Sequence, residues 1–252
     1  IHKCYLYFLQ VELFRHFDVE TQSGDMSFGV SLDQGRLEYS STFPRGLFGQ
    51  PGNMFKPGFW AMLRDIARFY RTAPGELAAG NLAGLSLGQY LERAGYSPGF
   101  AQNHLLPMGA AIWSAQVEDM ANHPAESFVR FFESHKLLDL GSRPPWRIVR
   151  GGSRTYVEKL TASFRDRISA NRPITRIRRS GNKVTLLDTH GQDHEFDHVV
   201  IATHANEALS MLEEPSSDER DILGAIPYIS NQAFLHQDHQ LMPKRKSVWS
   251  SW

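Results

Sequence analysis

Apolar residues in the first 140 positions recur mostly at helical spacing. Between residues 59 and 70 they follow the i, i+3, i+4, i+7 pattern of an amphipathic helix that buries one face. Residues 4–17 also predict a helix, with apolar side chains on nearly every side. The stretch 73–85, rich in Gly, Ala and Asn, is expected to be a connection. Further helices are predicted near residues 86–94, 99–106, 108–113 and 124–138.

A period of two replaces the helical spacing between residues 26 and 39. Met26, Phe28, Val30 and Leu32 alternate with small residues, and a turn at residues 33–35 then leads into a second strand. This pattern predicts a β-hairpin. Because an isolated hairpin is only marginally stable, we expect it to pair with other strands or to pack tightly against helices.

Strand-like runs dominate after Arg147. The run Val199–Ala202 is continuously apolar, which is typical of a strand buried on both faces. We expect the last two strands of the chain to join the hairpin 26–39 in one sheet, which would place Phe234 and Trp249 near the same cavity wall as Phe28. The strands are predicted near residues 147–150, 175–178, 184–187, 199–202, 232–236 and 247–251, with helices near 153–164, 206–212 and 217–223. The fold class is therefore α/β, with α+β character.

Composition and charge narrow the class of protein. The 252 residues contain 27 basic and 27 acidic side chains, so the basic excess that nucleic-acid binding usually requires is missing. The one cysteine, Cys4, excludes an internal disulfide and fits a cytoplasmic location. The longest strongly apolar run, Leu105–Trp113, is too short for a transmembrane segment. Both ends of the chain are apolar, so we expect an internal piece of a longer protein.

Two motifs suggest chemistry but have simpler explanations. Residues 84–88 match the G-x-S-x-G of a serine hydrolase, yet no strand pattern precedes Ser86, which pairs with Gln89 as a helix capping box. His190, His194 and His198 have the spacing of metal ligands on a helix, but Gly191 and the strand pattern argue against a helix there. We therefore expect a helix cap and surface histidines, and no metal site.

A pair of glycines starts the most informative stretch. Gly151 and Gly152 precede a predicted helix, and either form a simple turn or let the backbone approach a flat ligand. Residues 171–177 then read Asn-Arg-Pro-Ile-Thr-Arg-Ile, and residues 195–203 read Glu-Phe-Asp-His-Val-Val-Ile-Ala-Thr. No Gly-x-Gly triplet occurs anywhere, so the dinucleotide-binding fingerprint and the P-loop are both absent.

This succession resembles the flavin-dependent amine oxidase and phytoene desaturase superfamily. From about residue 19 onward it is still more similar to a bacterial branch described as NAD/FAD-binding proteins. The stretches that carry this closer likeness are Ser27-Phe28 with Val30-Ser31-Leu32, residues 105–114, residues 127–132, Trp146-Arg147 and residues 151–154. In this superfamily a glycine-rich βαβ unit precedes these segments and a second glycine-rich segment follows them. Both are missing here, so the chain alone is expected to be inactive and without bound FAD.

The resemblance implies an FAD-linked two-domain fold with a mixed β-sheet and a helical substrate domain. Residues 1–145 and 213–252 would form the two parts of the substrate-binding domain, and residues 146–212 part of the FAD-binding domain. It also implies that FAD lies near five positions, namely Gly151, Gly152, Ile174, Ala202 and Thr203. The implied substrate pocket is lined by seven others, namely Phe28, Met108, Trp113, Trp146, Arg154, Thr155 and Tyr156. For the aromatic residues Phe28, Trp113 and Trp146, ordinary packing in the core is an equal alternative.

The implied function is FAD-dependent oxidation of a small or lipid-like organic substrate by hydride transfer to the flavin. No residue stands out as a general acid or base, so the catalytic residues stay undefined. Amine oxidation and carbon–carbon desaturation are both open. Two alternatives come from other classes: a serine hydrolase that uses Ser86, and a non-catalytic binding module that has lost its cofactor.

Overall fold

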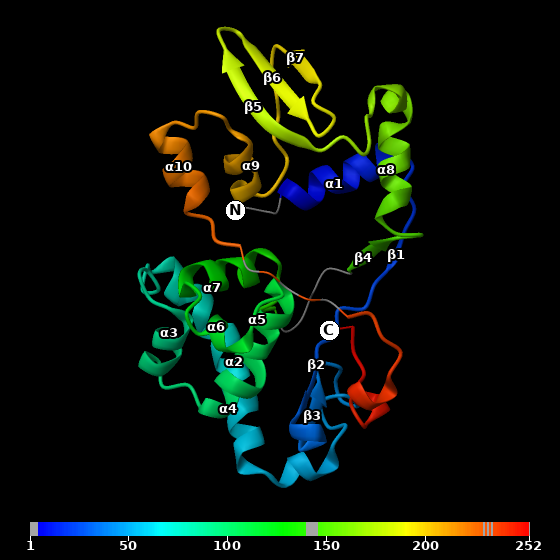
Figure 1. Ribbon diagram of the computed structural model, residues 1–252. Helices are drawn as coiled ribbons and strands as arrows, with labels where there is room; N and C mark the ends of the chain where they lie inside the picture. Colours follow the sequence, from blue (N-terminus) through cyan, green and yellow to red (C-terminus); the bar gives the residue numbers. More distant parts are fainter. Residues whose placement is uncertain (1–4, 140–145, 229, 231, 233, 252) are drawn as a thin grey trace. The chain divides into compact units, whose positions relative to one another are not determined.

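The computed structural model describes residues 5–139, 146–228, 230, 232 and 234–251 (Figure 1). The chain divides into two compact units. Unit 1 comprises Ile1–Leu160 with Ala233–Trp252, and unit 2 comprises Thr161–Gln232. Helices and small antiparallel sheets occur together, which confirms the predicted α/β class.

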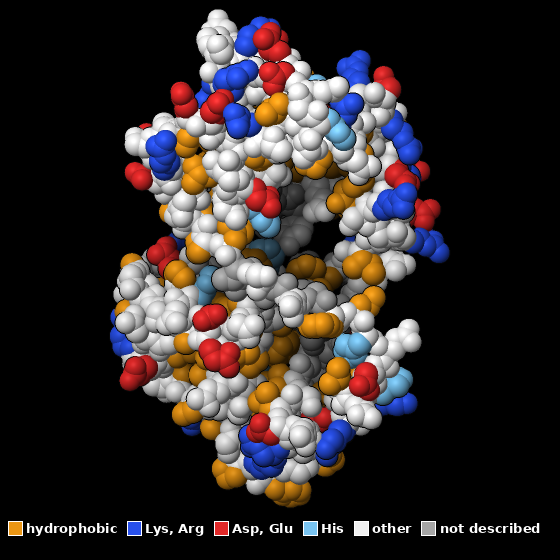
Figure 2. All heavy atoms as spheres, in the orientation of Figure 1, with side chains coloured by type: hydrophobic (Ala, Val, Ile, Leu, Met, Phe, Trp, Pro, Cys, Tyr) orange, Lys and Arg blue, Asp and Glu red, His pale blue; other side chains and the backbone are white. Residues whose placement is uncertain are grey.

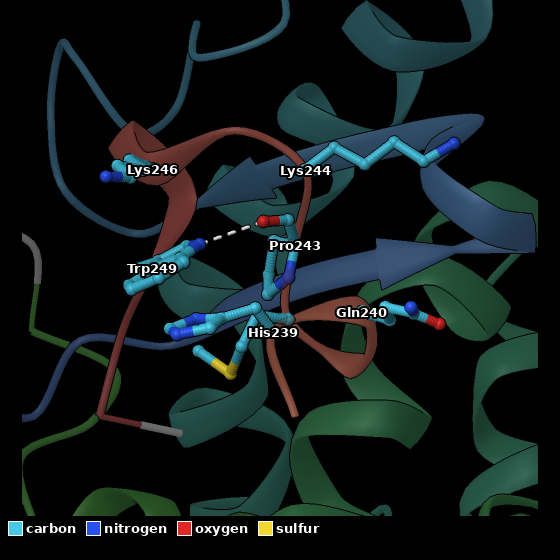
Figure 3. Close-up of a pocket in the computed structure, with 7 residues that line it drawn as sticks. His239, Gln240, Pro243, Lys244, Lys246 and Trp249 are labelled. Carbon is cyan, nitrogen blue, oxygen red and sulfur yellow. Dashed lines mark hydrogen bonds between the residues drawn. The ribbon is translucent and has the colours of Figure 1, made fainter. Parts of the chain in front are cut away.

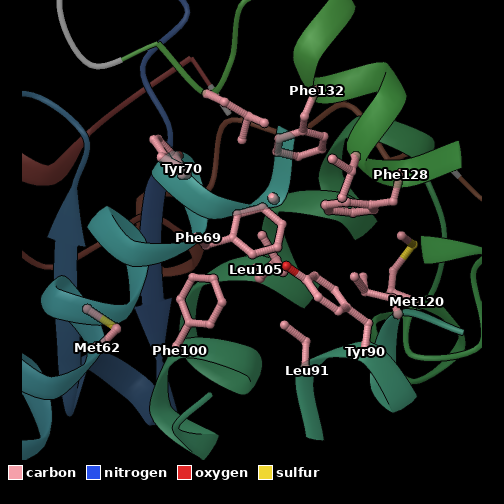
Figure 4. Packing of buried hydrophobic residues seen from close by; sticks show 14 of the residues in the cluster. Met62, Phe69, Tyr70, Tyr90, Leu91, Phe100, Leu105, Met120, Phe128 and Phe132 are labelled. Atoms are coloured by element: carbon pink, nitrogen blue, oxygen red, sulfur yellow. The ribbon is translucent and has the colours of Figure 1, made fainter. Parts of the chain in front are cut away.

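Helices build the core of unit 1. Large apolar side chains that are almost completely buried fill the space between these helices (Figure 4), in agreement with the predicted helical spacing. The helices are α2 (Pro57–Ala78), α3 (Leu87–Arg93), α4 (Pro98–Phe100), a π-helical turn η3 (Ala101–Leu105), α5 (Leu106–Trp113), α6 (Val117–Met120) and α7 (Ala125–Ser134).

Helix α2 is longer than its predicted apolar core. It continues through Pro74 to Ala78, so the expectation that residues 73–85 form a connection is wrong for the first six of them. The apolar face does not stop at residue 70, because Ala73 is fully buried and Leu77 packs against the core. Burial of this continued face outweighs the unfavourable proline.

The predicted hairpin is confirmed. Strand β2 (Gly29–Leu32) pairs with β3 (Leu37–Ser40) in antiparallel register, with Val30 opposite Tyr39. The connecting turn has three consecutive residues with positive φ, ending at Gly35 (φ 90°). Val30, Leu37 and Tyr39 belong to the helical core, so packing against helices supplies the stability that two strands alone lack.

The predicted pairing of this hairpin with C-terminal strands is wrong. Lys246–Val248 is a short 3-10 helix (η6), a second one covers His239–Leu241 (η5), and no strand forms among the described residues from 234 to 251. The C-terminal segment nevertheless lies against the hairpin. A Cβ added to Gly29 would come within 2.7 Å of the Val248 carbonyl oxygen, and Val248 is fully buried. Close packing therefore holds the C-terminal segment against the hairpin in place of the expected strand pairing.

Unit 1 contains a second pair of strands, of which the sequence predicted only the later one. Strand β1 (Thr21–Ser23) pairs antiparallel with β4 (Arg147–Val149), which follows the expected strand at residues 147–150. The flanking helices α1 (Tyr5–His16) and α8 (Ser153–Thr161) contact each other through Phe14 and Tyr156, whose ring centroids lie 5.3 Å apart.

Unit 2 contains a three-stranded antiparallel sheet in the order β5-β6-β7. The predicted strand Val199–Ala202 does not form, and Val200 is 92% exposed. A strand needs a partner backbone, and no described strand pairs with these residues. The elements of unit 2 are η4 (Ala162–Arg167), β5 (Ile174–Ser180), β6 (Lys183–Asp188), β7 (Asp193–Phe196), α9 (Ala205–Met211) and α10 (Ser217–Gly224).

Candidate functional site

The glycine pair lies between β4 and α8. Gly151 (φ 77°) and Gly152 (φ 84°) both adopt the left-handed backbone region that favours glycine. The Gly152 amide donates to the Val149 carbonyl (3.2 Å), and α8 begins at the next residue. A Cβ added to Gly152 would meet no atom within 4 Å. The turn is therefore a defined structure whose outer face is open to a ligand.

The three residues that follow the turn are placed differently. The Thr155 hydroxyl donates to the Gly152 carbonyl (2.8 Å), so this side chain stabilises the glycine turn. Tyr156 packs on Phe14 of α1. The Arg154 guanidinium is exposed and pairs with Glu158 one helical turn later (2.9 Å). Thr155 and Tyr156 thus have structural contacts of their own beside any role in a pocket.

Three of the four aromatic and methionine positions proposed for the pocket, Phe28, Met108 and Trp113, pack against the core of unit 1. Trp113 packs among Phe131, His123 and Phe128, with ring centroids 4.7, 5.0 and 5.4 Å away. Met108 packs against the same core. Phe28 meets the edge of His104, and the Trp146 carbonyl accepts a hydrogen bond from Gly24.

The remaining proposed cofactor positions belong to unit 2. Ile174 is the first residue of β5, where it lies opposite Asp188. Ala202 and Thr203 are exposed and immediately precede the N-cap of α9. The structure does not gather all proposed cofactor residues into one unit, since Gly151 and Gly152 lie in unit 1.

A buried carboxylate that the sequence analysis missed joins the hairpin to the C-terminal segment. The Glu38 side chain is fully buried, and it accepts hydrogen bonds from the Arg245 guanidinium (2.6 Å), the Lys244 backbone amide (2.7 Å) and the Ser31 hydroxyl (3.0 Å). Burial opposes its ionisation, but these donors outweigh burial and lower the pKa of Glu38 below its ordinary value. The sequence signal was a lone Glu on the apolar second strand of the hairpin.

A buried histidine, also missed, lies in the π-helical turn η3. Such turns are frequent at functional sites. The Tyr39 hydroxyl lies 2.8 Å from the Asn103 carbonyl and 3.0 Å from His104 Nδ1. Since Tyr39 has one proton to donate and the carbonyl can only accept, Nδ1 carries the hydrogen and Nε2 is an acceptor. Nε2 is buried and has no partner among the described residues. Burial lowers the pKa of His104 to about 4, so the ring is neutral at pH 7.

A shallow surface pocket of about 550 Å³ lies in the C-terminal segment (Figure 3). The Trp249 indole donates to the Pro243 carbonyl (2.8 Å) and its ring lies parallel to His239. The Lys246 ammonium lies over the Trp249 ring, 6.0 Å from its centroid. Trp249, which the sequence analysis expected near a cavity wall, lines this pocket, but none of the seven residues of the implied substrate pocket does.

The structure also bears on the serine hydrolase motif at Ser86, on a metal site and on membrane-spanning helices. The Ser86 hydroxyl accepts from the Gln89 amide (3.2 Å) and the Gln89 side chain accepts from the Ser86 amide (2.9 Å), which confirms the capping box. Within the described part of the chain, no three His, Cys, Asp or Glu side chains are placed to hold a metal ion. No described helix has the length and apolar character needed to cross a membrane.

The sequence profile of the family described as "Flavin containing amine oxidoreductase" matches residues 99–236, more than half of the chain. The chain therefore belongs to this flavin amine oxidoreductase family. The match spans the later helices of unit 1, from η3 through α7, together with the glycine turn and all of unit 2.

Solved structures show the same fold. Wild-type putrescine oxidase bound to putrescine has a TM-score of 0.58 and 15% identity, over 86% of this chain and 49% of that one. A CLA-producing fatty acid isomerase from P. acnes has a TM-score of 0.51 and 17% identity, over 87% of this chain and 49% of that one. This chain thus spans about half the length of these structures. No curated protein sequence matches it.

Proposed function

We propose that this chain is part of an FAD-dependent oxidoreductase that oxidises a small or lipid-like organic substrate. The observation that carries the proposal is membership of the flavin amine oxidoreductase family across residues 99–236. The open, left-handed glycine turn within that match supports it, because such a turn lets a backbone approach a flat ring closely. We further propose a cytoplasmic location, on the single cysteine.

The residues present fit one part of FAD recognition. Gly151 and Gly152 offer an open turn, Ala202 and Thr203 are exposed at the end of an apolar run, and Ile174 has its backbone at the start of β5. We propose that Ile174 contacts the adenine end of FAD through its backbone, and that the glycine turn faces the flavin. A glycine-rich pyrophosphate turn is absent from the 252 residues, so we propose that it comes from sequence beyond this chain.

When bound, the flavin supplies hydride acceptance, and the protein supplies position and exclusion of water. Thr155 holds the turn in shape through its bond to the Gly152 carbonyl. Phe28, Met108, Trp113, Trp146, Arg154 and Tyr156 remain proposed pocket residues. No described residue is assigned as a general acid or base.

The substrate class is tested by reduction of the flavin without oxygen. The polypeptide, as its own gene encodes it, is mixed with putrescine or with an unsaturated fatty acid, and loss of the visible flavin absorption is followed. Bleaching by either substrate class supports the proposal and chooses between amine and lipid chemistry. A flavin that neither these nor other amines and fatty acids reduce would argue for the binding-module alternative.

The place of the flavin is tested at the glycine turn. Gly152→Val is compared with Gly80→Val, because Gly80 also has positive φ (74°) and open space around its Cβ position. Both variants strain the backbone by a similar amount. Both variants are made in the polypeptide as its own gene encodes it. We expect the amount of FAD bound per polypeptide to fall only in Gly152→Val. Equal FAD content in both variants would remove the glycine turn from the site.

A further inference from the structure

An exposed apolar surface lies between β3 and the first turn of α2. Phe55 is 85% exposed, Phe43 74%, Trp60 49% and Met54 42%. Phe48 connects Phe43 to Trp60, since its ring lies 6.3 Å from the first and 6.1 Å from the second, and the Trp60 indole is bonded to the carbonyl of Met54, the neighbour of Phe55. We call these five residues the aromatic tip. Single exposed apolar residues are ordinary, but a contiguous group of this size marks an interaction surface.

The backbone holds this surface in place. The Gly46 and Leu47 amides donate to the Thr42 carbonyl (2.7 and 3.0 Å), and the Phe48 amide donates to the Pro44 carbonyl (3.1 Å). The Trp60 indole donates to the Met54 carbonyl (2.8 Å). Phe43 and Phe55 are therefore presented to solvent by an ordered loop, and they do not fold back onto the core.

The exposed charged side chains around the aromatic tip are mostly basic, although Arg64 lies 4.0 Å from the buried carboxylate of Asp65. Residues 41–64 contain three basic side chains, Arg45, Lys56 and Arg64, and no acidic one. Arg45 and Lys56 are exposed, and Arg64 follows Trp60 by one helical turn. Asp33, the exposed acid at the nearby hairpin turn, is already paired with Arg36. Around the start of α2 in unit 1, Figure 2 shows hydrophobic side chains with both basic and acidic side chains beside them.

We propose that the aromatic tip is a peripheral membrane-binding surface that inserts into bilayers with anionic headgroups. Aromatic side chains settle at the boundary between headgroups and acyl chains, where Trp keeps a polar end hydrated. Arg and Lys reach outward from apolar surface to anionic lipid. A protein partner of matching chemistry would need an acidic rim around an apolar groove, whereas a bilayer provides both features without shape matching. The inference is independent of the proposed flavin chemistry.

Sedimentation with vesicles tests the proposal. The chain is mixed with vesicles of phosphatidylcholine alone or with one third phosphatidylglycerol, at low and high salt. We expect binding to the anionic vesicles to exceed binding to the neutral ones by at least about tenfold at low salt, and to weaken at high salt. Equal binding to both vesicles, or none, would overturn the proposal.

Matched variants locate the surface. Phe43→Ser with Phe55→Ser is expected to reduce binding by at least about tenfold, because the inserted apolar area is lost. The control is Val200→Ser with Leu235→Ser, which removes two apolar residues of similar or greater exposure elsewhere and is expected to bind like the wild type. Circular dichroism checks that both double variants are folded.

The other occupants of the surface are distinguished in the same samples. The proposal is overturned if the tip variant binds like the wild type, or if the tip drives only self-association in size-exclusion chromatography. It is also overturned if the polypeptide, as its gene encodes it, does not bind while this chain does, since other sequence would then cover the tip. Arg45→Gln with Lys56→Gln should abolish the salt dependence; unchanged salt dependence would contradict the role of the basic rim.

Discussion

Glu38, on strand β3, is a charged side chain that is completely buried in unit 1. Glu38 gathers donors from β2 and from the C-terminal segment more than 200 positions away in sequence. It takes the place of the strand pairing that the hydrophobic pattern had suggested. Glu38 thus holds the C-terminal segment against the hairpin, together with the buried Val248 and the hydrogen bond from the Ser251 amide to the Ser27 hydroxyl.

Replacement of Glu38 tests this role. Glu38→Gln keeps the shape but removes the charge, and the loss of charge-assisted hydrogen bonds should lower the free energy of unfolding by about 2 kcal/mol. Arg245 is partly exposed and can be hydrated, which limits the cost. The C-terminal segment should also become more sensitive to protease. Glu12→Gln removes an exposed pair with Arg15 and should change little. Equal effects in both variants, measured by urea unfolding, would contradict the role of Glu38.

His104 makes stability depend on pH. Its pKa is lowered by burial from 6.5 to about 4 in the folded protein, so between these values the unfolded chain binds the extra proton. The contribution of His104 to the free energy of unfolding is fully present above pH 6.5. It falls as pH drops toward 4, by a total of about 3 kcal/mol. The stability difference between wild type and His104→Asn should change by this amount across that window. A flat curve for His104→Asn would refute the burial of this ring.

At the scale of elements, most helices followed the sequence closely, whereas three of the predicted strands did not form among the described residues. A helix satisfies its backbone within one segment, so local spacing sufficed for α2, α3, α7, α9 and α10. A strand depends on a partner that may lie far away in the sequence, and the apolar runs at residues 199–202 and 247–251 found none among the described residues. The hairpin β2–β3 was predictable because its partner is adjacent.

The site shows the same limit. The glycine turn was visible in sequence because two adjacent glycines are a local signal, whereas His104 and Glu38 gain their character only from burial by distant segments. Trp113 was expected either in a pocket or in the core; it packs against aromatic rings of the core and stays a proposed pocket residue. Sequence spacing alone does not separate these two environments.

Ser86 gives the element-scale prediction. Ser86→Ala removes the cap of α3 and should cost about 1 kcal/mol. Ser216→Ala is its match, since Ser216 caps α10 with the same hydroxyl-to-amide distance of 3.2 Å. Both variants should lose similar stability, and a fluorophosphonate probe should label neither the wild type nor the variants. Labelling of the wild type that disappears only in Ser86→Ala would support the serine hydrolase alternative.

At the scale of the whole molecule, two units carry the proposed cofactor residues, and neither has the glycine-rich turn that binds a pyrophosphate. We therefore expect the 252-residue chain alone to retain far less than one FAD per molecule, since most anion recognition is missing. Absorbance of the supernatant after denaturation measures this content. Stoichiometric FAD in the isolated chain would show that these two units suffice for binding.

The central claim, that the chain works within a flavoprotein, is tested most directly by the flavin content of the polypeptide as its own gene encodes it. The protein is purified with FAD present, excess cofactor is removed, and the bound flavin is released and identified. We predict one FAD per polypeptide and a yellow protein. A colourless protein that takes up no FAD under these conditions would contradict the claim.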